Sequence, residues 1–343
     1  MEQDRAARTW LVLGMLVLIF AALDFASAII APVTFALFII AIVWPLQSAL
    51  QKRIPKLLAL VITLVITIAV IAALISLVIW GFGLVVRWLV ANTARFQTLY
   101  VQATDWLEGH GIAAKSLLTD NYDARWLTGA VQHIGGRGYR LISFITIAFA
   151  FTVLGLLEVD IVRKNIERLG NQKVRQSLLL AGEDIAAKFQ KYMLVRSSMS
   201  VLTGVVVWSF ALIAGLELAT AWGVIAFVLN YIPFLGPLFA TVFPTLFALA
   251  QFESWKLAIA VFACLNVIQF FIGSYLEPRI AGATLSMSPF IVLFAVFFWS
   301  FLWGISGAFM GVPIVIAALT VCEEHDSSRW IAILLSGQSS KAS

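Results

Sequence analysis

Residues 57–86 run LLALVITLVITIAVIAALISLVIWGFGLVV, a stretch without a single charged side chain. About 20 consecutive apolar residues are enough for a helix to cross the hydrocarbon core of a bilayer. Hydrophobic residues make up 62% of the 343-residue chain and charged residues only 12%, whereas a soluble domain is roughly half apolar and a quarter charged. This composition excludes a secreted disulfide scaffold, a disordered tail protein and an ordinary cytosolic enzyme. We therefore predict an all-α, polytopic membrane protein.

Seven further apolar runs have the composition of membrane spans. Together with 57–86 they give about eight expected transmembrane helices, at 9–27, 29–46, 57–86, 141–157, 197–216, 219–250, 257–276 and 289–321. The runs 219–250 and 289–321 are too long for one simple crossing and contain Gly and Pro, so we expect each to be broken or re-entrant. The N-terminus has the pattern of a signal peptide, but Asp24 and the next apolar run favour an uncleaved pair of spans.

The distribution of Lys and Arg orients the expected spans, because cytoplasmic loops carry an excess of these residues. With the N-terminus inside, 16 of the 23 basic residues fall on the inner side and seven, including Arg279, on the outer side. The short loop with Lys52, Arg53 and Lys56 is basic, whereas the turn at 24–32 has no base. Both termini are therefore expected in the cytoplasm.

The resulting organisation has six parts. We expect three spans in 1–86, an outer helical segment in 87–140, one span in 141–157, a cytoplasmic amphipathic segment in 158–196, further spans with a re-entrant core in 197–321, and a cytoplasmic tail in 322–343. The outer segment is either a small helical cap, with one helix near 96–107 and another after Asp120 or Asp123, or a helical linker on the membrane. In the inner segment, Ile185, Phe189 and Tyr192 share one helical face near Lys188. This pattern predicts an interfacial helix on anionic lipid, with a partner-binding helix as the alternative.

Signatures of enzymatic and nucleotide-driven chemistry are missing from the sequence. There is no G-x-x-x-x-G-K-[ST] phosphate loop. Gly304-Ile305-Ser306-Gly307 resembles the motif of rhomboid proteases, but a serine nucleophile needs a nearby base, and the three histidines lie outside every expected span. The histidines also lack the spacing of metal ligands. The net charge is +5, and the basic residues do not form the cluster that a nucleic-acid-binding surface requires. We expect no catalytic residue, no cofactor, no metal and no nucleic-acid partner.

Two Gly- and Pro-containing segments in the C-terminal half are the most informative part of the chain. The first is Asn230-Tyr231-Ile232-Pro233-Phe234-Leu235-Gly236-Pro237. Proline lacks an N–H and clashes with the carbonyl four residues earlier, so Pro233 should free the carbonyl of Leu229, for which Asn230 could supply a partner. The second is the run around Pro313, with Gly304, Gly307 and Gly311 before it. Paired broken segments of this kind are typical of a transporter's central site; two kinked structural helices are the alternative.

Polar residues lie between these segments. Asn266 and Gln269 interrupt an apolar run that ends in Glu277-Pro278-Arg279. The two charges either end a helix at the outer interface or fold inward and line a pathway. The expected partners are the lipid bilayer and a small polar solute. The candidate residues of the substrate pathway are Asn230, Pro233, Gly236, Asn266, Gln269, Glu277, Arg279 and Pro313.

These motifs resemble the autoinducer-2 exporter family. The resemblance rests on Asn230-Tyr231-Ile232-Pro233 with Gly236, on Leu276-Glu277-Pro278-Arg279-Ile280 and on Val312-Pro313, and it extends over nearly the whole chain. Gly273-Ser274-Tyr275 departs from the polar step expected before Leu276. The resemblance implies a bacterial inner-membrane permease with eight spans and a re-entrant element. It also implies homo-oligomers, with pentamers as one form.

Three classes of function are compatible with these observations. The first, favoured by the resemblance, is export of a small polar signalling molecule, namely the quorum-sensing compound autoinducer-2. The second is a sodium/proton antiporter, which should need carboxylates at the membrane midplane; no acid lies there unless Glu277 folds inward. The third is a structural membrane protein, which would not need the broken helices.

Overall fold

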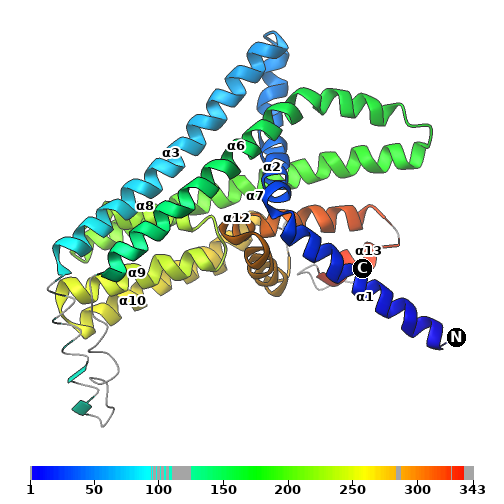
Figure 1. The fold of residues 1–343 in the computed structure, drawn as a ribbon. Helices are drawn as coiled ribbons and strands as arrows, with labels where there is room; N and C mark the ends of the chain where they lie inside the picture. Colours follow the sequence, from blue (N-terminus) through cyan, green and yellow to red (C-terminus); the bar gives the residue numbers. More distant parts are fainter. Residues whose placement is uncertain are drawn as a thin grey trace. The chain divides into compact units, whose positions relative to one another are not determined.

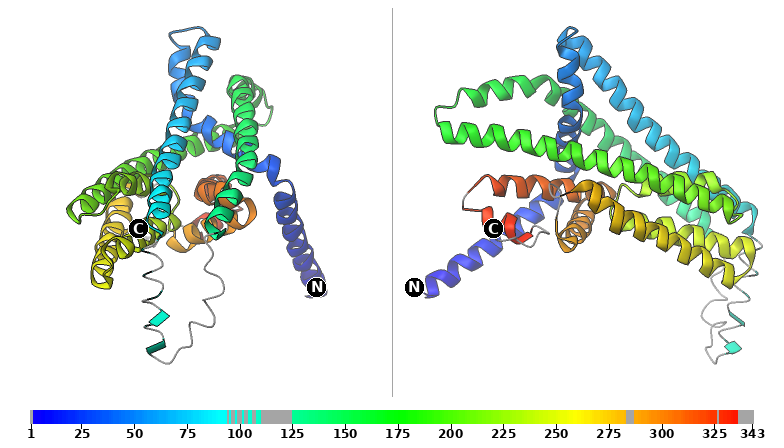
Figure 2. Two further views of the ribbon diagram at one scale, coloured as in Figure 1. Left: turned by 60° about the vertical axis from the view of Figure 1, so that its left-hand side comes forward. Right: turned by 180° about the vertical axis from the view of Figure 1, so that it is seen from behind.

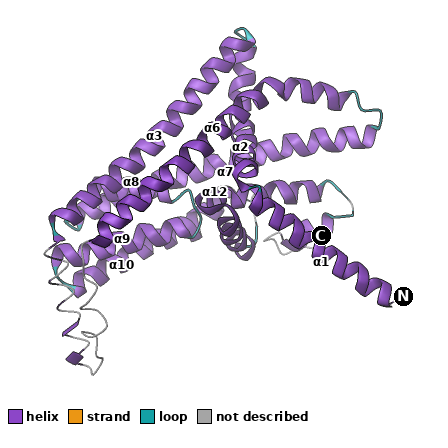
Figure 3. Cartoon of the chain, viewed as in Figure 1, coloured by secondary structure: helices purple, strands orange, loops and turns teal. Residues whose placement is uncertain are grey.

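The computed structural model of the chain consists of helices joined by turns (Figure 3). It describes residues 2–93, 95, 98, 101, 104, 105, 108, 109, 125–282, 287–325 and 327–335. Within these residues no β-strand occurs, which confirms the predicted all-α class. The helices labelled in Figure 1 and the shorter ones between them are α1 (Glu2–Phe25), α2 (Ser27–Gln51), α3 (Lys56–Ala91), α6 (Arg125–Glu167), α7 (Gln172–Ile213), α8 (Ala219–Leu229), α9 (Leu235–Phe252), α10 (Trp255–Phe270), the π-helix η2 (Phe271–Leu276), α11 (Glu277–Ala281), α12 (Pro289–Glu323) and α13 (Arg329–Leu335).

Seven segments in the described part are long and apolar enough to cross a membrane: α2, α3, the part of α6 from Ile142 to Glu167, α7, α9, the run Trp255–Ala281 and α12. Their surfaces fit that assignment. In α3, for example, Leu57, Val65 and Ile79 are exposed along the helix. An apolar surface of this extent marks contact with a membrane or another apolar partner, and here the lipid bilayer supplies that contact. The structure is thus that of a polytopic membrane protein.

The expected second helix of the outer segment is present, but it is continuous with the membrane span that follows it. Helix α6 begins at Arg125 and continues without interruption through the predicted span 141–157 to Glu167. The expected helix near 96–107 lies largely outside the described residues. The choice between a helical cap and a membrane-lying linker stays open.

The chain forms two compact units. Unit 1 comprises Met1–Thr67, Leu141–Met193 and Ala283–Ser343, and unit 2 comprises Ile68–Arg140 and Leu194–Gly282. Helices α3, α6 and α7 each contribute one part to each unit. The break-containing segment 219–250 therefore belongs to unit 2, whereas Pro313 belongs to unit 1.

Unit 1 is held together by aromatic and aliphatic packing. Ile40, Leu60 and Leu156 bring α2, α3 and α6 together in one apolar cluster. Phe38 of α2 packs edge-on against Phe189 of α7, with ring centroids 5.0 Å apart, and also contacts Phe309 of α12. The α7 part of unit 1 therefore lies against α2, inside protein.

This packing corrects the expectation of an interfacial helix in 158–196. Phe189 and Tyr192, which were expected among lipid headgroups, are buried in the protein. Lys188 is also enclosed; its ammonium contacts Asp184 at 2.9 Å and Glu323 at 2.6 Å. The predicted apolar face exists, but other helices of unit 1 cover it instead of lipid. The expectation failed because a periodic apolar pattern shows that a helix face is buried and does not show what buries it.

Helix α12 is a hairpin folded at Gly304, whose backbone has φ 64° and ψ −140°. A Cβ added to Gly307 would collide with the carbonyl of Trp299, and one added to Gly311 would lie 2.7 Å from the carbonyl oxygen of Ala295. In a straight helix, eight residues span about 12 Å, so the two arms must run back along each other. The predicted break in 289–321 is confirmed. It lies at Gly304, however, and the helix continues through Pro313.

Unit 2 is built from successive antiparallel helices. Gly204 and Gly223 let α7 and α8 approach closely, since an added Cβ would meet Phe227 Cβ at 2.8 Å or Trp208 Cβ at 2.6 Å. Trp222 of α8 packs against Phe247 of α9 with ring centroids 5.1 Å apart. Helices α9 and α10 lie side by side (Figures 1 and 2). The segment 219–250 is therefore broken as predicted, and the break reverses its direction.

Candidate functional site

Four uncharged polar side chains gather inside unit 2, and we call them the polar cluster: Ser200, Thr203, Asn230 and Gln269. Ser200 and Thr203 lie one turn apart on α7 and are fully buried. The amide of Asn230, at the end of α8, donates to Ser200 Oγ at 3.3 Å. Gln269 lies on the α7-facing side of α10, between the buried residues Leu265 and Ile272.

The register of α10 against α7 places Gln269 near this group. Ile272 packs with Val195 and Met199, and Ile268 belongs to the same apolar cluster. Leu265, one turn earlier on α10, shares another cluster with Val207. Gln269 therefore lies at the level of Ser200 and Thr203 along α7.

Two members of the polar cluster have unused hydrogen-bonding capacity. Thr203 Oγ1 and Gln269 Nε2 are buried, and neither finds a hydrogen-bond partner among the described residues. A buried polar group left without a partner destabilises a fold by about 1–3 kcal/mol. Thr203 Oγ1 and Gln269 Nε2 therefore each retain the capacity for a hydrogen bond.

The turn between α8 and α9 places Asn230 in the cluster. Pro233 is buried in this turn, Phe234 has a positive φ of 61°, and Gly236 is buried at the start of α9. A Cβ at Gly236 would collide with the carbonyl of Leu229, so only glycine allows the chain to reverse this sharply. The sequence-predicted residues Asn230, Pro233 and Gly236 all lie here.

The expected role of Asn230 toward Leu229 is wrong. The carbonyl of Leu229 accepts instead from the backbone N–H of Ile232 at 3.0 Å. A tight turn supplies the partner that the proline removes, and the Asn230 side chain is left to contact Ser200.

One end of the polar cluster carries an ion pair. Arg196 of α7, with a side chain only 7% exposed, contacts Glu277 through Nη1 at 2.8 Å to Oε1 and 3.0 Å to Oε2. One position on, Ser197 Oγ accepts a hydrogen bond from the Tyr231 hydroxyl at 3.0 Å. Ser197 is one turn before Ser200, so the pair and the tyrosine adjoin the cluster.

The remaining sequence-predicted residues lie elsewhere. Asn266 is exposed, and its amide donates to the carbonyl of Phe262 on its own helix. Arg279 is also exposed, with its guanidinium 3.8 Å from the centre of the Tyr275 ring. Pro313 is buried in α12 of unit 1. Glu277 and Arg279 therefore lie in different surroundings, because Glu277 contacts Arg196 whereas Arg279 is exposed.

The ion pair also corrects the expected sidedness. Arg196 was expected at the inner side and Arg279 at the outer side, yet Glu277 is bound to Arg196. The two ends therefore lie at the same side of the membrane. The physical reason is the reversal at Asn230–Phe234, which folds a segment expected to cross once into a helical hairpin.

Sequence reasoning missed Arg196, Ser197, Ser200 and Thr203. A signal was present, because Ser197, Ser200 and Thr203 recur every three residues at the start of an apolar run. Residues at this spacing share one helical face. A polar stripe on a membrane helix must be covered by protein or by a solute-filled cavity.

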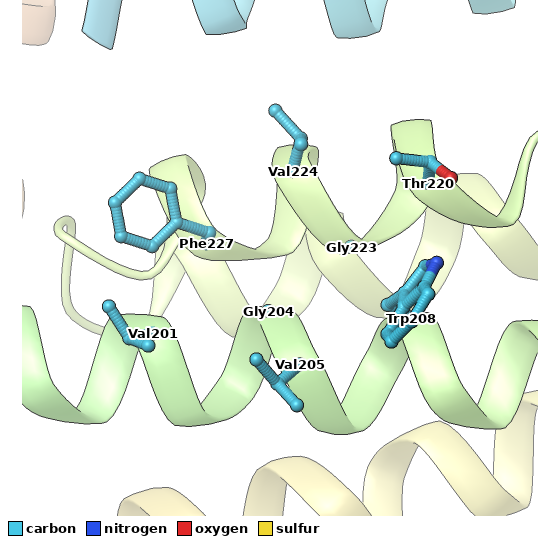
Figure 4. A pocket seen from close by; sticks show the side chains of 8 residues that line it. All are labelled: Val201, Gly204, Val205, Trp208, Thr220, Gly223, Val224 and Phe227. Atoms are coloured by element: carbon cyan, nitrogen blue, oxygen red, sulfur yellow. The ribbon is translucent and has the colours of Figure 1, made fainter.

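A second surface feature of unit 2 offers no such chemistry. A groove of about 250 Å³ between α7 and α8 is lined by Trp208, Phe227 and other apolar side chains, with Thr220 as its only hydroxyl among the lining residues (Figure 4). It has almost nothing to bind a polar solute. Among the residues that the structure describes, no group of three or more His, Cys, Asp or Glu could hold a metal ion.

The sequence is similar to those of known proteins. The model of the AI-2E family transporter matches residues 13–325. The chain is 28% identical to the AI-2 transport protein TqsA of Escherichia coli (strain K12) over 335 residues, which cover 95% of this chain and 94% of that protein.

Shorter matches involve proteins named as putative transporters. YhhT of Escherichia coli (strain K12) is 33% identical over 144 residues, which are 42% of this chain and 41% of YhhT. A putative transport protein of Borreliella burgdorferi is 27% identical over 213 residues, 62% of this chain and 58% of that protein. These two matches span less than two thirds of the relatives' length. Because the family model covers nearly the whole chain, and the fold is that of a polytopic helical membrane protein, this chain belongs to the AI-2E family of transporters.

Proposed function

We propose that this chain exports a small polar signalling molecule across the bacterial inner membrane, with autoinducer-2 as the expected solute. The solute binds at the polar cluster of unit 2. The unpartnered Thr203 Oγ1 and Gln269 Nε2 carry this proposal, because they are buried groups that a hydroxylated solute would satisfy. Similarity to TqsA, an AI-2 transport protein, supports the choice of autoinducer-2.

The charges around the cluster favour an uncharged solute. Arg196 is neutralised by Glu277 at one end, and Ser200, Thr203, Asn230 and Gln269 are themselves uncharged. Hydroxyl and amide groups offer both donors and acceptors. An ion in this position would have no opposite charge to compensate its burial.

The same geometry argues against the antiporter alternative. A sodium/proton antiporter needs a carboxylate that is free to exchange a proton for a cation. Both oxygens of Glu277 contact the Arg196 guanidinium. Sodium-dependent proton movement therefore serves as the competing outcome in the assay below.

The proposed topology keeps both termini in the cytoplasm and puts the Arg196–Glu277 pair at the inner side. It rests on the excess of basic residues in the segments assigned to that side. The hairpins at Asn230–Phe234 and Gly304 each replace one expected crossing with two antiparallel arms. Together they add two reversals of direction, so the two termini stay on one side. We further propose a homo-oligomer, on the strength of the family resemblance.

The test is export of autoinducer-2 by purified protein in liposomes. Thr203→Val and Gln269→Leu each remove one hydrogen bond to the solute, worth about 1 kcal/mol or about fivefold in affinity. Both variants should also unfold at a higher temperature than the parent, because an unsatisfied buried group is gone. Asn266→Leu, an amide on the exposed side of the same helix, is the matched control and should transport normally.

The combination of lower transport and higher stability separates a binding role from a structural one. Unchanged transport by both Thr203→Val and Gln269→Leu would rule out the polar cluster as the site. Sodium-driven proton movement without export of autoinducer-2 would establish the antiporter instead.

A further inference from the structure

Helix α10 does not end as an ordinary α-helix. It passes into the π-helix η2, in which the N–H of Glu277 bonds to the carbonyl of Ile272, five residues earlier. Pro278 follows, and its ring excludes α-helical bonding to the carbonyl of Ser274. Short π-helical turns inside α-helices are found frequently at functional sites.

The π turn decides which charge meets Arg196. Ile272 marks the α7-facing side of the helix, and an α-helix continuing from it would bring Arg279 round to that side after two turns. Because a π turn holds more residues than an α turn, the helix returns to the α7-facing side about one residue later along the chain. As a result, Glu277 meets Arg196 and Arg279 is exposed, whereas continuous α-helix would turn one arginine toward another.

The ion pair closes one end of the polar cluster. Arg196 is buried one residue before Ser197, whose hydroxyl binds Tyr231 from the α8–α9 turn. Glu277 attaches η2 and α11 to the same end of α7. A solute that reaches Ser200 from this end must pass the contact between Arg196 and Glu277.

We propose that η2 is the moving part of a gate over the polar cluster, an inference that rests on the transport function proposed above. In the closed state the π turn holds Glu277 on Arg196. When the turn relaxes to an α-helix, a register change of one residue rotates Glu277 by about 100° and withdraws it from Arg196. The same rotation turns Arg279 toward Arg196, and the repulsion between the two like charges pushes α11 away from α7. The pair separates, and the end of the cluster opens.

A reversible cross-link tests the gate. Val195→Cys on α7 and Leu276→Cys, at the last residue of η2 and next to Glu277, place two thiols in one apolar cluster. The background carries Cys264→Ser and Cys322→Ser, because both native cysteines are free. Oxidation should stop export of autoinducer-2 from liposomes, and a reductant should restore it.

The matched control joins the same two helices away from the π turn. Val207→Cys with Leu265→Cys lies in the main apolar cluster of unit 2 and should export the solute equally well when oxidised and reduced. If the oxidised Val195–Leu276 pair exports at the same rate as the reduced protein, the gate is overturned. Absence of export from the reduced control protein, with its fold intact, would instead overturn the proposed function and the gate with it.

A second variant needs no cross-link. Pro278→Ala removes the obstacle to α-helical bonding and should favour the open state. Its liposomes should leak trapped autoinducer-2 severalfold faster than those of the parent. A leak rate equal to that of the parent would contradict a π turn that opens the gate.

Discussion

Gln190 of α7 compensates for a proline in a different helix. Pro45 lies inside α2 and has no N–H, so the carbonyl of Ala41, four residues earlier, has no α-helical donor. The side-chain amide of Gln190 donates to that carbonyl at 2.9 Å, across 149 positions of sequence. We predict that Gln190 stabilises unit 1 chiefly through this one bond.

A double-mutant cycle measures the bond. Gln190→Leu leaves the Ala41 carbonyl without its partner and should lower the free energy of unfolding by about 1–3 kcal/mol. In a Pro45→Ala background, the new N–H at position 45 satisfies the same carbonyl, so Gln190→Leu should then cost little. The expected coupling is about 1–2 kcal/mol, within the range for residues in direct contact.

The assay is unfolding of the purified protein in detergent by added SDS, followed by tryptophan fluorescence. The control is Gln176→Leu, since Gln176 is an exposed glutamine of the same helix, and it should leave stability nearly unchanged in both backgrounds. Equal destabilisation by Gln190→Leu with and without Pro45 would refute the reasoning. It would mean that packing of the side chain, rather than the orphaned carbonyl, accounts for the effect.

Three further predictions concern the turn, the enclosed lysine and the topology. Gly236→Ala should prevent stable folding of unit 2, because its Cβ would collide with a backbone carbonyl. The control Gly83→Ala, with nothing within 4 Å of the added Cβ, should be neutral or slightly stabilising. Thermal unfolding compares the two variants, and normal stability of Gly236→Ala would contradict the reversal. Asp184→Asn combined with Glu323→Gln should destabilise unit 1 more than Lys188→Met in the same unfolding assay. The double change leaves the enclosed ammonium of Lys188 unpaired, whereas Lys188→Met leaves two carboxylates that are largely solvated. The opposite order would show that packing of the Lys188 side chain outweighs its ion pairs. A cysteine replacing Lys115 should react with an impermeant reagent added outside spheroplasts, and reaction only after permeabilisation would reverse the proposed orientation.

Local patterns predicted much of the fold. The break at 230–234 followed from Pro233 and Gly236, and the structure has its turn there. The break in 289–321 was also predicted, but it lies at Gly304. Proline removes one hydrogen bond and can stay inside a helix when packing holds it. A glycine with a positive φ can reverse the chain.

The candidate site was less accessible to sequence reasoning. Asn266 and Gln269 both carry an amide side chain and lie three residues apart in the same apolar run. Asn266 is nevertheless exposed, whereas Gln269 is buried. Apolar residues surround both faces of a membrane helix, so hydropathy does not show which face meets protein. Glu277 and Arg279 posed the same problem, and the π turn resolved it.

Composition and local patterns alone established that this chain crosses a membrane as helices and that two of its apolar runs are interrupted. Both properties are local, since they depend on the length of apolar runs and on the backbone limits of proline and glycine. Only the tertiary structure decided that the interruptions are reversals and that Glu277 meets Arg196, 81 residues away. Such a pairing depends on the register between two helices. One π turn shifts this register by a residue, and the shift leaves no periodic pattern in the sequence.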